Sequence, residues 1–419
     1  MSRRLLTTII AGQVAGQVEQ HESGQLTFTY EPGYQGAPLS ISMPIGNRSY
    51  SDKQIRPYLF GLLPDDDRVR RNTGLEYDVS GNNPFALLTH IGLDCPGAVQ
   101  FCPSGKVAEA LARPSITTPV TDAEIAERLR IGRTRSDLAW TTPTEHWSLG
   151  GQQSKFALRL VDGAWHSCHG AAATTHIFKC GISHLAYQAL NEYVCMKLAN
   201  DCTIPCAQVE YRLFEDEPAI IVTRYDRFTN TQGEIERFHQ EDFCQALGVL
   251  PENKYPEYGG PAAIDIIRLL KQTSPYATDN LTQFATMLFF NYLIGAPDAH
   301  AKNYSLLIAG NGDMRLAPLY DVASILPYRK PHMTYKVAMS IGGENRIGHL
   351  TRNAIERFAE TAGLPAQDCV QLMATLARMI PERFAAVCDA EAHIPGMDVL
   401  REHWEEPLVK LCEDTLEKL

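Results

Sequence analysis

The chain has 419 residues, a formal net charge of −11 at pH 7 and a hydrophobic content of 44%. The acidic balance argues against a protein that mainly coats nucleic acid or an anionic membrane, although a local basic patch is still possible. The hydrophobic content suffices for one large or two to three ordinary globular domains. No apolar run approaches the roughly 20 residues of a membrane helix. Polar residues interrupt the apolar start LLTTIIA, which favours a first strand over a signal peptide.

The eleven cysteines are odd in number and scattered along the chain. None of them forms a C-x-x-C pair followed by further ligands at zinc spacing. We therefore expect reduced thiols and a cytoplasmic location.

Residues 1–112 have the pattern of a small β-rich domain. Short strands are predicted at LLTTIIA, QVAGQVEQ, QLTFTY, PLSISMP and GAVQFCP. A helical stretch runs from Gln54 into LLPDDDRVRR, where the acidic run Asp65–Asp67 is better explained as a helix start than as a metal site. Residues 113–140 then read as a linker, ARPSITTPVTD, and a helix capped by Thr121 or Asp122.

Residues 141–228 resemble a small antiparallel lobe. Gly150 and Gly151 precede the strand KFALRL, and glycines allow backbone N–H groups to approach phosphate oxygens closely. The segment matches neither common phosphate-loop pattern, so a plain hairpin turn is the alternative. The strand THIFK ends at Lys179, which could contact phosphates or simply lie in water. The strands QVEYRLF and PAIIVTRYDRF follow, with Thr223–Tyr225 at the end of the lobe.

Residues 229–419 have mostly helical patterns. The predicted helices are HQEDFCQALGV, AIDIIRLLKQ, LTQFATMLFFNYLIG, TRNAIERFAETAG, DCVQLMATLARMIPERFAAVCD and VLREHWEEPLVKLCEDTLEKL. The order of elements predicts an α+β, two-lobed protein-kinase-like fold. It would have a β-rich N-lobe, an all-helical C-lobe and an additional small β-rich N-terminal domain.

The segment 291–324 contains a recognisable arrangement of polar residues. Asp298 is followed five residues later by Asn303, then by a predicted hairpin closed at 310–313, and then by Asp321. Kinases use an Asp to accept the substrate hydroxyl proton, and an Asn and a second Asp to hold Mg²⁺. The hairpin would bring Asn303 and Asp321 together. The alternative is that these side chains only cap turns, because D-x₄-N pairs are common by chance.

These motifs, taken together, resemble the HipA family of bacterial serine/threonine kinases, the toxins of HipBA-type toxin–antitoxin pairs. The resemblance covers nearly the whole chain and is strongest in SLGGQQSK, TTHIFK, VTRYDRF, YLIGAPDAHAKNYSLL and LAPLYDVAS. The pattern D-x-H-x-K-N followed by Y-D is specific to this family.

The resemblance implies a role for each matching residue. Asp298 would be the catalytic base, Asn303 and Asp321 would bind Mg²⁺, and Ser148 would be the site of autophosphorylation. The implied ATP-binding residues are Gly150, Gly151, Gln152, Gln153, Ser154, Lys155, Lys179, Thr223, Arg224, Tyr225, His300, Ala301, Lys302, Asn303, Tyr320 and Asp321.

The resemblance also implies ATP and Mg²⁺ as cofactors, a HipB-type helix-turn-helix antitoxin as partner, and a protein substrate. An aminoacyl-tRNA synthetase is the expected substrate class, with glutamyl-tRNA synthetase the best guess. The segment 358–377 contains neither Lys nor Arg, so we expect contact with DNA only indirectly, through the antitoxin. Two alternatives are a two-lobed small-molecule kinase and a catalytically inactive module that binds nucleotide or antitoxin.

Overall fold

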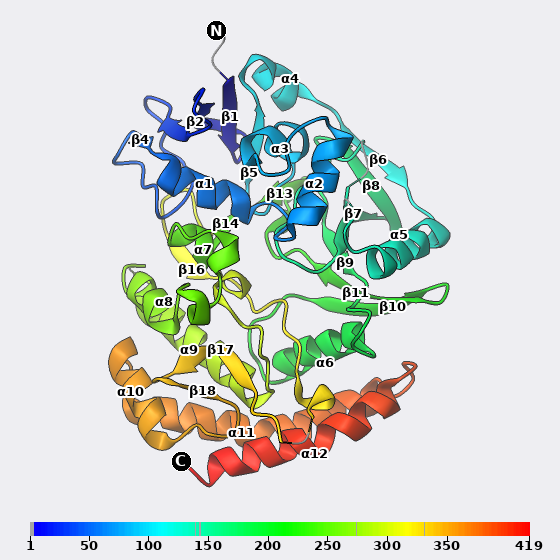
Figure 1. The fold of residues 1–419 in the computed structure, drawn as a ribbon, viewed down its shortest axis with the longest axis vertical. Helices are drawn as coiled ribbons and strands as arrows, with labels where there is room; N and C mark the ends of the chain where they lie inside the picture. The colour runs from blue at the N-terminus through cyan, green and yellow to red at the C-terminus, as the bar shows by residue number, and fades with distance from the viewer. Residues whose placement is uncertain (1–3, 139, 142–143, 274, 331) are drawn as a thin grey trace. The chain divides into compact units, whose positions relative to one another are not determined.

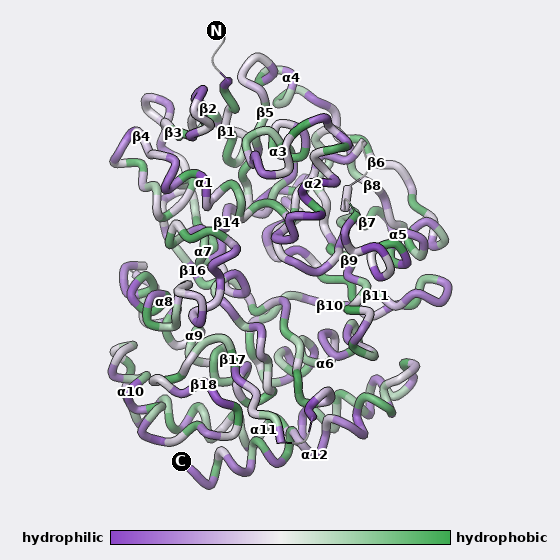
Figure 2. Tube along the Cα trace, in the orientation of Figure 1, coloured by the Kyte–Doolittle hydropathy of each residue, from purple (hydrophilic) through white to green (hydrophobic). Residues whose placement is uncertain are grey.

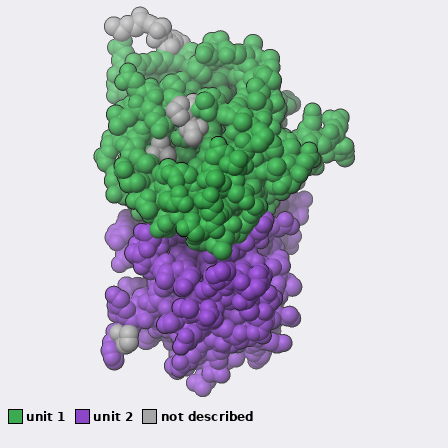
Figure 3. All heavy atoms as spheres, turned by 90° about the vertical axis from the view of Figure 1, so that its right-hand side faces the viewer, with its two compact units in different colours: residues 1–180, 212–252, 306–314 green, residues 181–211, 253–305, 315–419 purple. Residues whose placement is uncertain are grey.

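The computed structural model describes residues 4–138, 140–141, 144–273, 275–330 and 332–419. These residues form two compact units, which Figure 3 shows in different colours. Unit 1 comprises residues 1–180, 212–252 and 306–314, and unit 2 comprises residues 181–211, 253–305 and 315–419. The chain therefore passes repeatedly between the units.

The N-terminal part of unit 1 is a five-stranded antiparallel sheet with three helices (Figure 1). The strand order is β4-β3-β2-β1-β5. Ala11 and Gly12, both at positive φ, turn β1 into β2, as a two-residue hairpin requires. The elements are β1 (Arg4–Ile10), β2 (Gln13–Gln20), β3 (Leu26–Tyr30), β4 (Ser49–Tyr50), α1 (Asp52–Gly61), α2 (Asp67–Glu76), α3 (Pro84–Ile91) and β5 (Val99–Pro103).

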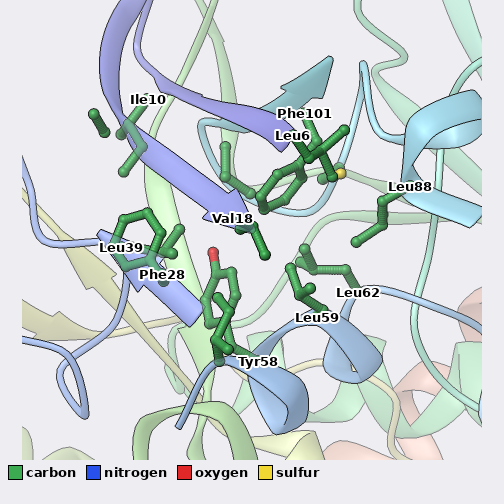
Figure 4. Close-up of a cluster of buried hydrophobic side chains, with 14 of the residues drawn as sticks. Leu6, Ile10, Val18, Phe28, Leu39, Tyr58, Leu59, Leu62, Leu88 and Phe101 are labelled. Atoms are coloured by element: carbon green, nitrogen blue, oxygen red, sulfur yellow. The ribbon is translucent and has the colours of Figure 1, made fainter. Parts of the chain in front are cut away.

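Apolar side chains of this sheet and of α1 and α3 form one core (Figure 4). Leu6, Val18 and Phe28 from the strands and Leu59 from α1 are completely buried. Burial of such side chains is the main favourable contribution to folding. The N-terminal sheet therefore has its own hydrophobic core, as the strand patterns at LLTTIIA, QVAGQVEQ and QLTFTY predict.

A second sheet follows, with the strand order β10-β11-β9-β7-β8-β6. The helix α5 packs on β7 and β11, and Figure 2 shows the apolar colouring of its residues alternating with polar ones. Thr121 begins α5 with a complete capping box formed with Glu124, which confirms one of the two predicted caps. The elements are η1 (Ser104–Lys106), α4 (Val107–Ala112), β6 (Ser115–Pro119), α5 (Asp122–Thr134), β7 (Lys155–Val161), β8 (Ala164–Gly170), β9 (His176–Lys179), β10 (Val209–Phe214) and β11 (Glu217–Thr223).

Unit 1 is completed by short elements from later in the chain. They are β12 (Arg227–Thr229), β13 (Ile235–Arg237), β14 (His239–Asp242), α7 (Phe243–Ala246) and η2 (Pro251–Asn253), together with most of the hairpin β15 (Ser305–Ile308) and β16 (Met314–Leu316). The predicted hairpin between SLLIA and MRLAPLY is confirmed.

Unit 2 is mainly helical. The long helices α11 and α12 run side by side (Figure 1), and α11 also packs on α6 and α9. The elements are α6 (Gln188–Asp201), η3 (Pro256–Tyr258), α8 (Ala263–Leu270), α9 (Ala277–Leu293), η4 (Ala301–Asn303), η5 (Leu326–Tyr328), β17 (Lys336–Ile341), β18 (Glu344–Arg346), α10 (Arg352–Ala362), α11 (Ala366–Ala390) and α12 (Met397–Leu416).

Four local predictions differ from the structure. PLSISMP is not a strand but a turn region containing one isolated bridge, Ser40–Met43. The predicted linker contains β6, which pairs along its length with β8. The segment HQEDFCQALGV is a strand, β14, followed by only one helical turn, because Asp242 caps a new helix start in its middle. The hairpin β17–β18 was not predicted in the helical lobe.

Within the described residues, no helix has the length and apolar character needed to cross a membrane. The predicted domain boundaries at 112, 140 and 228 stay predictions, and residues 139 and 142–143 near the second of them lie outside the described residues.

Candidate functional site

The loop that carries Asp298 begins where the buried helix α9 ends. Gly295 follows the helix with φ +65°, a conformation that side chains with a Cβ rarely adopt. A Cβ on Gly295 would lie 2.8 Å from Leu326 Cγ. The glycine therefore allows both the sharp exit from α9 and the close approach of η5.

Asn303 organises this loop. Its Nδ2 donates hydrogen bonds to the backbone carbonyl oxygens of Asp298, at 2.9 Å, and of Asp321, at 3.3 Å. An amide nitrogen with two acceptors fixes the orientation of the side chain, so Oδ1 is left to accept a hydrogen bond or to bind a cation. The spacing D-x₄-N and the hairpin thus bring 298, 303 and 321 together, as the sequence pattern predicts.

Asp321 has φ +59°. A non-glycine residue in the left-handed region is uncommon, and Asp and Asn are the residues that tolerate it best. Such outliers gather at functional sites when the surroundings hold them in place. Ser324 supplies part of that support, because its backbone N–H and carbonyl oxygen bond the Asn191 side chain of α6.

Asp298 is accessible, with 66% of its side chain exposed. The hydroxyl of Tyr255 donates a hydrogen bond to Asp298 Oδ1, and His300 Nε2 lies 3.9 Å from the same oxygen. The rings of Tyr255 and His300 meet edge to face with centroids 4.8 Å apart. A carboxylate with one oxygen held and most of its surface open is suited to accept a proton from a hydroxyl group.

The remaining predicted residues of this loop are structural neighbours of Asn303. His300, Ala301 and Lys302 are buried. The hydroxyl of Tyr320 donates to the Lys302 carbonyl oxygen at 2.7 Å and lies 2.6 Å from Ser305 Oγ. Tyr320 therefore ties the end of the hairpin to η4, just before Asp321.

Mg²⁺ prefers converging oxygen ligands, and the donor set here fits this preference. The hydrogen bond from Asn303 Nδ2 to the Asp321 backbone carbonyl oxygen brings the two residues together, and their side chains carry an amide oxygen and a carboxylate. The described residues contain no cluster of three or more His, Cys, Asp or Glu side chains that could hold a metal ion. A pair made of one amide and one carboxylate leaves the remaining ligands to water and substrate phosphates, as is usual for Mg²⁺.

The predicted phosphate loop, 150–155, lies in unit 1. Gly151 has φ +100°, and its carbonyl oxygen accepts a 2.8 Å hydrogen bond from the backbone N–H of Asp65. The Gly151 N–H in turn points to Asp65 Oδ1 at 3.4 Å. The N-terminal domain thus holds the tip of the glycine loop through the acidic run, which the sequence interpretation had assigned only to a helix start.

Lys155 and Lys179 are directly opposite each other on the paired strands β7 and β9. Both are buried, although lysine is normally exposed. Lys155 Nζ donates a 3.0 Å hydrogen bond to the Gly150 carbonyl oxygen. Two cationic side chains therefore lie on one face of this sheet, one of them against the glycine loop. Within that loop Gln152 is exposed and Ser154 is buried.

Arg224 is part of a buried ion cluster and not of an open surface. Its guanidinium contacts Asp226 at 2.9 Å and Thr174 Oγ1 at 2.8 Å. Arg227 bonds Asp94 at 3.0 Å and Arg237 bonds the same carboxylate at 2.9 Å. Burial would raise the pKa of Asp94, but these arginines hold it well below its usual range. Arg224 belongs to the segment 223–225, which was predicted to bind ATP. In the same segment, Thr223 is the last residue of β11 and the Tyr225 hydroxyl donates a hydrogen bond to Gln240 Oε1.

Ser148 is held beside this cluster. It is 1% exposed, its backbone N–H donates to the Asp94 carbonyl oxygen at 3.1 Å, and its hydroxyl lies 3.3 Å from Cys95 Sγ. In this conformation the Ser148 hydroxyl is closed to any phosphate donor.

Three residues that contact the predicted ones are not indicated as site residues by the sequence pattern: Tyr255, Asp65 and Asp94. Tyr255 lies 43 residues before Asp298, and no local pattern links the two. The LPDD and LDCPG segments carried a signal, since acidic residues followed by turn residues often bind backbone N–H groups, but their partners are decided by the fold.

The two units together define a class of protein: an α+β, kinase-like fold with a glycine loop and strand lysines in one unit and an Asp-x₄-Asn loop before a hairpin in the other. Comparisons with known proteins agree. The sequence matches the family models "HipA N-terminal domain" over residues 6–102 and "HipA-like C-terminal domain" over residues 147–384.

Individual relatives cover most of the chain. A putative kinase of Sinorhizobium fredii is 36% identical over 370 residues, which is 87% of each protein. The serine/threonine-protein kinase toxin HipA of Shewanella oneidensis is 30% identical over 416 residues, 92% of this chain and 89% of the relative. A solved complex of HipA, HipB and operator DNA from that species contains a chain with a TM-score of 0.80 and 26% identity, covering 98% of this chain and 97% of the other. The protein therefore belongs to the HipA family of serine/threonine kinase toxins.

Proposed function

We propose that the protein is an ATP- and Mg²⁺-dependent serine/threonine protein kinase that acts in the cytoplasm as a growth-arresting toxin. The observation that carries this proposal is the Asn303 amide, whose two hydrogen bonds gather the backbone of Asp298 and Asp321 around one possible metal ligand. Each of the three residues has the chemistry that its kinase role requires.

In this proposal Asp298 accepts the proton of the substrate hydroxyl, and Asn303 and Asp321 hold Mg²⁺. The bound ion would neutralise phosphate charge during transfer. The proposed nucleotide-binding residues next to Asp298, Asn303 and Asp321 are His300, Ala301, Lys302 and Tyr320. Tyr255 orients the Asp298 carboxylate through its hydroxyl.

The ATP phosphates are proposed to bind residues 150–155 and Lys179. The glycines permit backbone N–H groups to approach the phosphates, and two buried lysines provide positive charge. At 223–225 the side chain of Arg224 is committed to its ion cluster, so any contact of this segment with adenine falls to backbone groups and to Thr223 and Tyr225.

We further propose that Ser148 is autophosphorylated. Since its hydroxyl is buried against Cys95, phosphorylation requires the segment to leave its place beside Asp94. Because Ser148 is 1% exposed in this position, returning a dianionic phosphate to it would carry a large desolvation cost. The modification would therefore leave the glycine loop displaced and lower the affinity for ATP.

The antitoxin partner is proposed to be a HipB-type helix-turn-helix protein, because the solved relative was crystallised with HipB and operator DNA. The protein substrate is proposed to be an aminoacyl-tRNA synthetase, with glutamyl-tRNA synthetase the first candidate. Contact with DNA would run through the antitoxin, since residues 358–377 carry no Lys or Arg.

The test is incubation of the purified protein with γ-³²P-ATP, Mg²⁺ and bacterial lysate, followed by mass spectrometry of any labelled band. Labelling of a synthetase and of Ser148, absent from the Asp298→Asn variant, is the expected result. Label found only in a small-molecule fraction would favour a small-molecule kinase. ATP binding without any transfer would favour a non-catalytic module.

A further inference from the structure

Unit 1 contains a pocket of about 150 Å³ between α5 and the sheet that follows the glycine loop. This volume is comparable to an engineered cavity that holds benzene. The lining comes from α5, from the segment after it, from the start of β7 and from the end of β9. The lining residues are Arg128, Leu129, Ile131, Gly132, Arg135, Leu138, Trp140, Thr141, Ser154, Lys155, Phe156, Phe178 and Cys180.

Most of the pocket lies on the face of the sheet opposite to Lys179. Phe156 and Phe178 are paired across β7 and β9, one residue away from the Lys155–Lys179 pair, and neighbouring side chains of a strand point to opposite faces. Their rings stack with centroids 5.0 Å apart. Ser154 and Lys155 are therefore the only proposed ATP-binding residues that this pocket includes among the described residues.

Three polar groups in the lining have no hydrogen-bond partner within the described residues: Ser154 Oγ, Trp140 Nε1 and Thr141 Oγ1. Ser154 is only 7% exposed. Buried polar atoms are nearly always paired, so an orphan in a native structure calls for an explanation, such as a bound water or ligand as its partner. Because the indole N–H can only donate, that partner must carry an acceptor oxygen or nitrogen.

Gly132 preserves the space. It lies within α5, where glycine is unfavourable for the helix. A Cβ at this position would lie 3.4 Å from both Cys180 Sγ and Ser154 Cβ, which is ordinary contact, so alanine fits. A larger side chain would extend into the volume beside Ser154.

We propose that this pocket binds a one-ring aromatic molecule bearing a carbonyl or carboxylate oxygen. The aromatic and aliphatic lining accommodates the ring, and Trp140 Nε1 and Ser154 Oγ bind the oxygen. The basic residues Arg128, Arg135 and Lys155 line the pocket and no acidic described residue does, which disfavours a cationic ligand. Arg128 and Arg135 also pair with Glu145 and Asp137, so a neutral carbonyl compound is as suitable as an acid.

Such a ligand would act on the glycine loop, a consequence that depends on the proposed function. Ser154 and Lys155 end the loop, and Lys155 bonds the Gly150 carbonyl oxygen. A ligand held by Ser154 favours the loop conformation seen here by mass action. It therefore raises the affinity for ATP.

The first test needs no ATP. Acetophenone, benzoate, ethylbenzene and benzylamine are titrated into the whole protein, with binding followed by ligand-observed NMR and calorimetry. We expect acetophenone or benzoate to bind with Kd on the order of 0.1–1 mM, as suits so small a ligand. Ethylbenzene, which lacks the acceptor, and benzylamine should bind at least about tenfold more weakly. Equal binding of ethylbenzene, or no binding by any probe, overturns the proposal.

Variants of two lining residues test whether the probes bind in this pocket. Gly132→Leu should weaken the binding probe by at least about tenfold, whereas Gly132→Ala should change its Kd less than about threefold. Trp140→Phe, which keeps an aromatic ring and removes the N–H, serves if Gly132→Leu fails to fold, and should reduce the preference for acetophenone over ethylbenzene. Unchanged Kd values in Gly132→Leu and Trp140→Phe overturn the assignment to this pocket.

ATP binding is then measured with and without the saturating probe. A lower Kd for ATP supports the coupling, and an unchanged Kd overturns it. Failure of the wild-type protein to bind ATP at all would contradict the proposed function instead, and would leave the probe titrations valid.

Discussion

The side-chain amide of Asn303 donates a 3.3 Å hydrogen bond to the backbone carbonyl oxygen of Asp321, across the base of the hairpin β15–β16. Asp321 is in the left-handed conformation, with φ +59°. The bond therefore joins a side chain before the hairpin to a strained backbone position after it. This pair supplies the two proposed Mg²⁺ ligands, and its chemistry and backbone geometry can be tested separately.

The first prediction concerns Asp321. Asp321→Asn should keep the loop conformation, because Asn tolerates positive φ as well as Asp does, but it removes the charge that binds the metal. Phosphoryl transfer should fall by at least about 100-fold, and Mg²⁺ should no longer strengthen ATP binding in calorimetry. An unchanged circular-dichroism melting curve is the control for folding. Transfer at the wild-type rate would rule out Asp321 as a metal ligand.

The second prediction concerns the Tyr255 hydroxyl, which bonds Asp298. Tyr255→Phe removes a hydrogen bond worth about 1 kcal/mol, so kcat should fall about fivefold while KM for ATP stays nearly constant. Tyr258→Phe is the matched control, because Tyr258 is 71% exposed and stacks edge to face on Tyr255. Steady-state kinetics that show equal losses in both variants would contradict a positioning role for Tyr255.

The third prediction concerns the tether between the N-terminal domain and the glycine loop. Asp65→Ala removes the carboxylate that faces the Gly151 N–H at 3.4 Å, while the backbone hydrogen bond at 2.8 Å persists. A looser loop should raise KM for ATP about two- to fivefold and speed phosphorylation of Ser148. Asp67→Ala, at an exposed neighbour paired only with Arg71 among the described ion pairs, should change neither. Phosphopeptide mass spectrometry over time distinguishes the variants.

The fourth prediction concerns the buried ion cluster. Asp94→Ala removes a carboxylate that contacts Arg224, Arg227 and Arg237. Asp226 then remains to pair with Arg224 and Arg227, and loss of one partner of a buried pair costs about 3–5 kcal/mol. Urea unfolding should show this loss. Asp122→Ala disrupts an exposed pair with Arg212 and should cost less than about 1 kcal/mol. A small effect of Asp94→Ala would mean that water enters the cluster.

The fifth prediction concerns the pH dependence of stability. Burial raises the pKa of Glu241 to about 8 and lowers the pKa of His239 to about 4. The folded chain thus holds the Glu241 proton more tightly than the unfolded chain, so stability falls as the pH rises from about 4.5 to 8. The folded chain holds the His239 proton less tightly, so stability also falls as the pH drops from about 6.5 to 4.

The two effects oppose each other between about pH 4.5 and 6.5. The melting temperature of the wild-type protein should therefore be highest in this weakly acidic range and decrease on both sides of it. Glu241→Gln keeps the hydrogen bond that the side-chain oxygen accepts from the Ile41 N–H and removes the ionisation. The alkaline decline should become shallower in this variant while the acid decline persists. Identical profiles of the two proteins would show that Glu241 does not ionise in this range.

The sequence by itself determined the features that depend on local pattern. Apolar alternation placed the strands β1, β2, β3, β7 and β9, and polar spacing with Thr121 placed the start of α5. The spacing from Asp298 to Asn303 and the turn at 310–313 brought the candidate site together, because a hairpin must return its ends to one place. The family resemblance rested on the same short motifs.

Only the tertiary structure decided which distant residues support that site. No sequence pattern near Asp298 predicts its hydrogen bond with Tyr255. No pattern near Gly151 predicts its contact with Asp65. Arg224 was expected to serve nucleotide binding, yet its guanidinium lies in a buried cluster with Asp94 and Asp226, although its role in ATP binding stays a prediction. Side-chain partners are selected by burial and hydrogen-bond satisfaction across the whole fold, and no local pattern encodes that selection.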